Sequence, residues 1–183
     1  MRYNSFMQVS MIVASTLDGF IAQSEKQNST QWTSEADKKW FGEISRECKI
    51  LVMGRTTYET IGRVLPGRII VVMSRREVAN LAPLNELRDD VDEGVFVTNL
   101  APPELLAKLQ ETGRKRVAIC GGASIYSQFF ELNLIEDIYL TIEPVMFGTG
   151  VKLIDKELYR KFTLIDQKRI SDKVSVFHLR VEK

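Results

Sequence analysis

The sequence predicts an α/β protein with a mixed, mostly parallel sheet and helices on both faces. Up to Ile138, short apolar runs typical of buried strands alternate with amphipathic segments typical of helices. This alternation predicts βαβ units, in which consecutive strands run parallel and a helix connects them. After Ile138, strand-like runs follow one another with little convincing helix, and we therefore expect an antiparallel finish.

The expected elements follow one another in a regular order. Strands are expected at 9–15, 50–53, 69–73, 95–98, 117–120, 138–142, 162–168 and 174–181. Helices are expected at 34–47, 55–62, 102–112 and 124–131. Proline and glycine support several boundaries: Pro66-Gly67 suits a turn before a strand, Pro102-Pro103 the first turn of a helix, and Gly113 its end.

Length and composition restrict the class of protein. The 183 residues correspond to a single domain, 1–183, and a hydrophobic content of 44% suffices for a buried core, which excludes a disordered chain. The net charge of +1 argues against nucleic acid or an anionic membrane as the main partner. The sequence has no apolar run that could span a membrane, and residues 1–8 lack the apolar stretch of a signal peptide. We therefore expect a cytoplasmic protein, and the sequence leaves open whether it is a monomer or a homodimer.

Cysteine and histidine counts restrict the chemistry. Cys48 and Cys120 are far apart in the sequence and form no disulfide framework by themselves. His178 is the only histidine, and it lies in an alternating segment that suits an ordinary strand position. A zinc site built on several histidines is therefore excluded, and we expect no metal. An enzyme with this composition would use carboxylates, hydroxyls, arginines, backbone amides and a bound cofactor.

Three strand ends carry residues suited to phosphate. Cys120-Gly121-Gly122-Ala123-Ser124 joins a strand to a helix, where glycines allow close approach and the helix start offers free N–H groups. Gly54-Arg55-Thr56-Thr57 opens another helix, and Ser74-Arg75 follows the next strand. Each motif alone has a simpler explanation, a tight turn or a solvated arginine. Because the carboxyl ends of parallel strands share one edge of the sheet, the three together favour a phosphate-bearing cofactor such as NADP.

Asp37 has two interpretations. Ser34 and Asp37 have the spacing of a capping box, in which the serine side chain bonds the amide three residues on and the acid bonds back. The capping role alone explains an acid at this position. However, Trp32, Trp40 and Phe41 surround it in sequence, and a partly desolvated carboxylate can bind the N–H groups of a heterocycle. The polar segment 23–31, which follows Asp18-Gly19, is a candidate lid over such a site.

The segment from Val9 to Ser74 resembles dihydrofolate reductases, and a weaker similarity extends to the C-terminus. The pattern W-x-x-x-x-D-x-x-W-F at 32–41 is similar to the family's substrate-binding helix, and MGRTTYETIGRVLPGR at 53–68 to its cofactor helix and the loop after it. CGGASIY and YLT are further shared segments. The resemblance implies a three-layer dihydrofolate reductase-like fold and hydride transfer from NADPH to a small-molecule substrate, 7,8-dihydrofolate or a related pterin or pyrimidine.

The resemblance also implies roles for individual residues. Asp37, Trp32 and Thr141 match residues of the catalytic site. The residues that match substrate contacts are Ala14, Asp37, Phe41, Ile61 and Arg68. The residues that match NADPH contacts are Ala14, Ile21, Gly54, Arg55, Thr56, Thr57, Ser74, Arg75, Cys120, Gly121, Gly122, Ala123, Ser124, Ile125 and Tyr126.

Three departures leave the substrate open. Gln31 replaces the usual proline before the loop tryptophan, Ile70 replaces an asparagine after the LPGR arginine, and Cys120 replaces an aliphatic residue. STLDGFIA and WTSE also resemble the reductase domain of the riboflavin pathway, which acts on a ribosylaminopyrimidine. We favour dihydrofolate because Arg68 is present; a riboflavin-pathway reductase is the first alternative, and a catalytically silent NADP-binding protein is the second.

Overall fold

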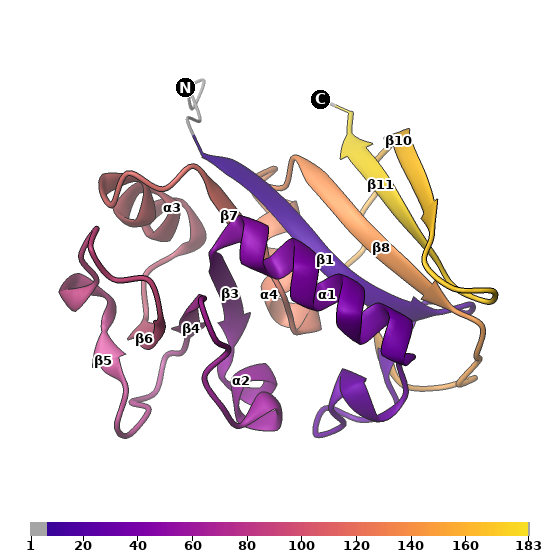
Figure 1. Cartoon of the computed structure of the whole chain (residues 1–183), viewed down its shortest axis with the longest axis horizontal. Helices are drawn as coiled ribbons and strands as arrows, with labels where there is room; N and C mark the ends of the chain where they lie inside the picture. Colours follow the sequence, from indigo (N-terminus) through magenta and orange to yellow (C-terminus); the bar gives the residue numbers. More distant parts are fainter. Residues whose placement is uncertain (1–6, 183) are drawn as a thin grey trace.

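The structure, a computed structural model, describes residues 7–182 and forms a twisted sheet with helices on both faces (Figure 1). Residues 1–6, which carry most of the segment used above to exclude a signal peptide, lie outside the described residues. The helices are α1 (Glu35–Cys48), α2 (Arg55–Ile61), α3 (Pro102–Glu111) and α4 (Ala123–Glu131). Each matches an expected helix to within about one residue at either end.

The central sheet has nine strands in the order β10-β11-β8-β1-β7-β3-β4-β6-β5. Their bounds are β1 (Gln8–Thr16), β3 (Ile50–Gly54), β4 (Ile69–Met73), β5 (Ala82–Pro83), β6 (Gly94–Thr98), β7 (Arg116–Ile119), β8 (Asp137–Glu143), β10 (Phe162–Arg169) and β11 (Ser175–Val181). The pairs from β8 to β5 are parallel, whereas β11 is antiparallel to both β8 and β10. The expected α/β fold class, including the antiparallel C-terminal strand, is confirmed.

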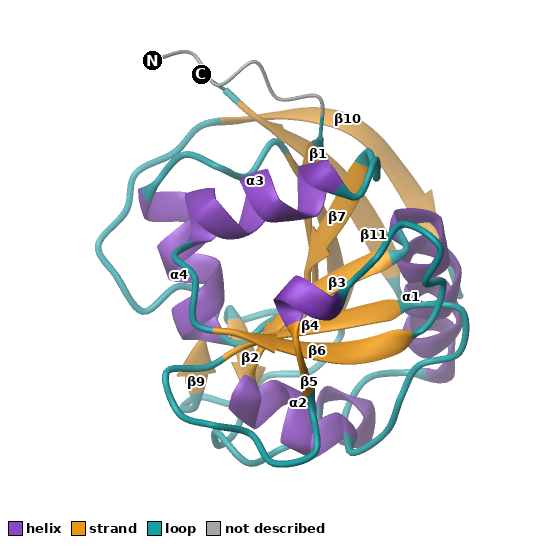
Figure 2. Cartoon of the chain, turned by 90° about the vertical axis from the view of Figure 1, so that its left-hand side faces the viewer, coloured by secondary structure: helices purple, strands orange, loops and turns teal. Residues whose placement is uncertain are grey.

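Each face of the sheet has its own apolar core. On one face, residues of α3 and α4 such as Leu105 and Phe129 pack on alternate residues of the central strands. On the other, Ile44 and Cys48 of α1 pack on the intervening residues, such as Leu51. Because β3, β4 and β7 are buried on both faces, their sequences are almost continuously apolar rather than alternating. Figure 2 shows α3 and α4 on one side of the sheet and α1 on the other.

The starts of three helices lie at the same edge of the sheet. Residues of β3 lead directly into α2, and residues after β7 lead into α4, so both helices begin at the carboxyl ends of parallel strands. The first residues of α1 also lie at this edge, because Ser34 contacts Glu143 at the end of β8. In open α/β sheets this edge is where ligands bind.

The short strands were not expected from the sequence. β2 (Phe20–Ala22) pairs with β9 (Val151–Lys152) in a separate two-stranded sheet, and β5 adds a two-residue edge strand. Two or three residues are too few to show an alternating pattern, so only tertiary contacts reveal them. Among the described residues, no helix combines the length and apolar character needed to cross a membrane.

Candidate functional site

A cleft of about 1620 Å³ lies along the carboxyl edge of the sheet. It is lined by every residue predicted for the substrate or the cofactor. Of the three residues predicted to be catalytic, only Asp37 lines it; Thr141 contacts Asp37 through its side chain, and Trp32 is not a lining residue. The structure therefore brings together segments that are more than 100 residues apart in the sequence.

Asp37 is a buried carboxyl group at the start of α1. Asp37 is 7% exposed, and desolvation raises the pKa of its carboxyl group above the ordinary value. Hydrogen bonds from the side chains of Thr141 and Thr33 favour the carboxylate and oppose this shift, whereas the negative charge of Glu143 adds to it. The cleft thus contains an acid that holds its proton more tightly than a surface aspartate.

The structure corrects the capping-box interpretation of Asp37. The Ser34 hydroxyl does accept a hydrogen bond from the Asp37 backbone N–H at 3.2 Å, as expected for a helix cap. The reciprocal bond is not made by Asp37: Glu143 Oε1 accepts from the Ser34 N–H at 2.8 Å and from its hydroxyl at 2.7 Å. The Asp37 carboxyl group therefore does not bond the Ser34 N–H, and Asp37 lines the cleft.

Arg68 is a buried cation that also lines the cleft. Its residue is 5% exposed, its Nη1 donates to the Ser45 hydroxyl at 2.8 Å and its Nε to the Pro66 carbonyl at 3.2 Å. Burial is the main cause that lowers the pKa of its guanidinium below the usual value. No carboxylate among the described residues forms an ion pair with it. A planar guanidinium with unused N–H groups suits a carboxylate or a phosphate.

The Gly121-Gly122 turn also lines the cleft and forms a cradle there. Gly121 has a φ of +122°, and the peptide bond between the two glycines is cis. The Gly121 carbonyl accepts from the Gly54 N–H at 2.8 Å, which ties the start of α4 to the start of α2. A Cβ on Gly122 would lie 3.3 Å from Thr57 Oγ1, so a side chain would fill the space between these segments. The cradle suits a diphosphate held by backbone N–H groups.

The predicted phosphate-binding side chains have different surroundings. Arg55 lines the cleft, but its Nη1 forms an ion pair with Glu59 at 2.6 Å. The Ser74 hydroxyl is bonded to the backbone of Arg76. Arg75 is exposed, lines the cleft and has no ion pair among the described residues. Arg75 is therefore the more available of the two cations for an added phosphate.

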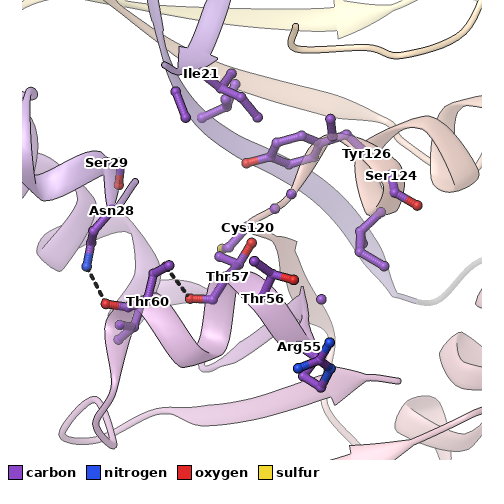
Figure 3. A pocket seen from close by; sticks show the side chains of 18 of the residues that line it. Ile21, Asn28, Ser29, Arg55, Thr56, Thr57, Thr60, Cys120, Ser124 and Tyr126 are labelled. Carbon is purple, nitrogen blue, oxygen red and sulfur yellow. Dashed lines mark hydrogen bonds between the residues drawn. The ribbon is translucent and has the colours of Figure 1, made fainter. Parts of the chain in front are cut away.

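The expected lid lies against the cofactor side of the cleft (Figure 3). Asn28 Nδ2 donates to the Thr60 carbonyl of α2 at 2.6 Å, and a dashed line marks this bond in Figure 3. Behind the lid, Trp32 packs edge-on against Phe147 at 5.2 Å between ring centroids. The buried indole N–H of Trp32 has no hydrogen-bond partner within the described chain. Such a group is available to a water or ligand.

Tyr126 and Cys120 both line the cleft (Figure 3). The Tyr126 hydroxyl donates to the Ile12 carbonyl at 2.9 Å, so its role includes holding α4 on β1. Burial raises the pKa of the Cys120 thiol far above its usual value, which makes it an unreactive apolar contact. His178 lies outside the cleft, where its Nε2 is 3.0 Å from Asp137 Oδ1, as suits a strand position.

Sequence reasoning missed several residues of the site. Thr33 and Glu143 act on Asp37, and Arg46 and Arg63 line the cleft near Arg68. Glu143 is separated from α1 by about 100 residues, so no local pattern connects them. Arg46 and Arg63 are exposed, and nothing in their local sequence distinguishes a residue of a cleft from one that faces bulk solvent.

Comparisons with known proteins show the family of the chain. The RibD C-terminal domain family matches residues 7–176. A dihydrofolate reductase from Buchnera aphidicola subsp. Baizongia pistaciae (strain Bp) is 32% identical over 143 residues, 78% of this chain and 75% of the relative.

Solved structures share the fold at lower identity. A putative riboflavin biosynthesis protein from Shewanella sp. PV-4 superposes with a TM-score of 0.77 at 21% identity, covering 97% of this chain and 100% of that chain. A diaminohydroxyphosphoribosylaminopyrimidine deaminase/5-amino-6-(5-phosphoribosylamino)uracil reductase from Thermotoga maritima gives 0.75 at 18% identity, covering 96% of this chain and 56% of that chain.

Proposed function

The chain belongs to the RibD C-terminal domain family, and we propose that it is an NADPH-dependent reductase whose substrate is 7,8-dihydrofolate. Membership supports an oxidoreductase acting on a small molecule. The proposal of dihydrofolate rests on the side chains of the cleft and on the 32% identical dihydrofolate reductase.

One observation carries the proposal: a single cleft joins the buried Asp37 to the glycine cradle. For hydride transfer, a donor that carries a diphosphate must lie in the same cleft as the flat heterocycle of the substrate and contact it. The cradle at Gly121-Gly122 suits the diphosphate, Asp37 suits the heterocycle, and Ala14 and Ile21 line the space between. The residues present therefore fit NADPH, with Arg75 and Arg55 available to its 2′-phosphate.

NADPH would supply the hydride, from C4 of its nicotinamide to C6 of the dihydropterin, and N5 would gain a proton. Asp37 would bind the 2-amino and N3 groups of the ring, with Thr141 and Thr33 holding its carboxyl group in place. Phe41 and Ile61 would exclude water from the ring faces, and we expect water near Trp32 to deliver the proton.

The raised pKa of Asp37 suits this role. A carboxyl group in a dry pocket strengthens each hydrogen bond to a polarised heterocycle, because the local dielectric is low. When it is ionised, its negative charge also favours a proton on the neighbouring ring. Arg68, at the outer end, would pair with the α-carboxylate of the glutamate tail.

A riboflavin-pathway reductase is the second candidate. The family match and the structural neighbours favour it, and Arg68 would then hold the phosphate of a ribosylaminopyrimidine. The test is the loss of NADPH absorbance with dihydrofolate, run beside the same assay with 5-amino-6-(5-phosphoribosylamino)uracil. Turnover of dihydrofolate supports the proposal, whereas turnover of the pyrimidine alone supports the second candidate in its place.

A further inference from the structure

A second, smaller pocket lies on the face of the sheet that α4 covers. It has a volume of about 270 Å³, and its lining side chains come from strands of the sheet, from the end of α4 and from the segment that follows β9. Nine of these side chains are apolar and two are cationic. None of the lining residues also lines the larger cleft, so the two sites are separate.

The pocket has a buried apolar floor and an open rim. Met11 of β1 is 0% exposed, and Phe130 of α4 and Ile138 of β8 are also buried. Leu158, from the segment after β9, packs against this core but is only half-buried, and Phe162 at the start of β10 is exposed. Water gains little from such apolar walls, so the pocket favours an apolar ligand.

Two cations complete the lining, Lys156 and Arg160. Lys156 Nζ lies 3.7 Å from Glu131 Oε1, which partly balances its charge. Arg160 forms no ion pair among the described residues. Its Nη groups donate to neutral acceptors at 2.8 to 3.5 Å, two backbone carbonyls and the side-chain oxygen of Asn133. These bonds hold a guanidinium with an unbalanced charge and further N–H groups at the pocket, which suits a carboxylate.

We propose that this pocket binds a medium-chain aliphatic carboxylate, with its chain against the apolar walls and its carboxylate at Arg160. A dry apolar cavity of about 150 Å³ holds a benzene-sized ligand, so a pocket of about 270 Å³ suits a body of about eight to ten carbon atoms. The two aromatic rings of the pocket, Phe130 and Phe162, already pack edge-on against each other at 6.5 Å between centroids, and the other apolar side chains are aliphatic. The site does not depend on the reductase activity proposed above.

The first test compares three probes with the same chain and different head groups. The wild type is titrated by calorimetry with octanoate, octanol and octylammonium. Octanoate should bind at a single site, about 3- to 10-fold more tightly than octanol, as for a partly exposed charged contact, and octylammonium should bind more weakly than octanol. Absence of saturable octanoate binding, or equal affinity for the three probes, overturns the proposal.

Variants locate the bound probe. Arg160→Gln should remove the advantage of octanoate over octanol, whereas Lys161→Gln, the matched control, should keep it, because Lys161 is an exposed neighbouring cation that does not line the pocket. Leu158→Trp, which fills the pocket, should abolish binding of both probes. Thermal melts and NADPH titrations verify that each variant folds with an intact cleft. Octanoate affinity that is unchanged in both Arg160→Gln and Leu158→Trp overturns the proposal, and the head-group series in the wild type decides it if a variant fails to fold.

A second copy of the chain is the competing occupant, because Phe162 belongs to β10, the exposed edge strand of the sheet. Sedimentation of the wild type and of Phe162→Glu, with and without octanoate, distinguishes the two occupants. Saturable octanoate binding without a change of oligomeric state supports the carboxylate site. A dimer that Phe162→Glu dissociates and that binds no octanoate assigns the pocket to the second copy and overturns the proposal.

Discussion

Glu143, the last residue of β8, accepts hydrogen bonds from both the backbone N–H and the hydroxyl of Ser34, the residue that caps α1. The carboxylate is buried, at 3% exposure, and satisfies a donor that would otherwise be left at the helix start. This contact relieves Asp37 of the capping role that its sequence position suggests. It also places a second negative charge near Asp37, which contributes to the raised pKa of that acid.

Glu143→Gln should therefore shift the titration of Asp37. A glutamine oxygen can still accept from Ser34, but the repulsive charge is lost, so the pKa of Asp37 should fall toward its ordinary value. The pH dependence of kcat reports this shift. Glu143→Ala is the comparison, because it leaves the Ser34 N–H unpaired and should destabilise the fold by about 1–3 kcal/mol. An unchanged pH profile in Glu143→Gln would show that the charge of Glu143 does not affect the titration of Asp37.

Asp37→Asn should lose most turnover and keep NADPH binding. Asparagine has nearly the same size, and its single carbonyl cannot accept from both the amino and N3–H groups of a pterin. NADPH affinity, measured by calorimetry, should be unchanged, because Asp37 is not among the residues predicted to contact the cofactor. Comparable kcat in the variant would leave Asp37 without a catalytic role.

The same variant should gain stability at neutral pH. The folded state raises the pKa of Asp37, so the folded chain binds this proton more tightly than the unfolded chain, and the free energy of unfolding falls as pH rises through that window. Asp37→Asn removes this loss. At pH 7 the melting temperature of the variant should equal or exceed that of the wild type. At pH 4 the difference between the two melting temperatures should be smaller than at pH 7. A lower melting temperature at pH 7 would contradict the desolvation argument.

Gly122→Val should lose the cofactor before it loses the fold. The added Cβ meets Thr57 Oγ1 at 3.3 Å, and the two methyl groups extend into the cradle. Gly122→Ala, which adds the Cβ alone, is the graded control and should show a smaller effect. Thermal melts and NADPH titrations of both variants separate folding from binding. If Gly122→Val binds NADPH like the wild type, the turn has a structural role only.

NADPH should be preferred over NADH, chiefly through Arg75. A charged hydrogen bond contributes about 1.5–3 kcal/mol, so Arg75→Gln should weaken NADPH binding by about 10- to 100-fold and leave NADH binding unchanged. Arg76→Gln removes the same charge from a neighbouring residue that does not line the cleft. Arg55→Ala should have a smaller effect, because Arg55 is already paired with Glu59. Equal affinity of the wild type for both cofactors would refute the assignment.

The sequence predicted the long elements well because each carries its own pattern. Helix α1 begins at a serine cap, α3 at two prolines, and α2 and α4 directly after glycines that follow strands. The central strands include continuous apolar runs, so most bounds follow from local signals. The short strands β2, β5 and β9 have no such pattern. The positions of Asp37 and Arg68 in one cleft came from the resemblance, and nothing in their spacing alone predicts it.

Long-range polar contacts were beyond local patterns. The Ser34–Glu143 contact joins residues that no periodicity relates, and the apparent capping box at Ser34 and Asp37 suggested a different partner. No local pattern distinguishes Arg46 from a solvated helix residue, although it lines the cleft. Such contacts become visible only when the strand order is known.

The most direct test of the proposed function is the initial rate of NADPH oxidation with dihydrofolate and with a tail-less dihydropterin, in the wild type and in Arg68→Leu. The account predicts that the wild type reduces both. Arg68→Leu should raise the KM of dihydrofolate by about 30- to 150-fold, the equivalent of about 2–3 kcal/mol, and leave the KM of the tail-less pterin nearly unchanged. A wild type that ignores both pterins and reduces only the ribosylaminopyrimidine would contradict it.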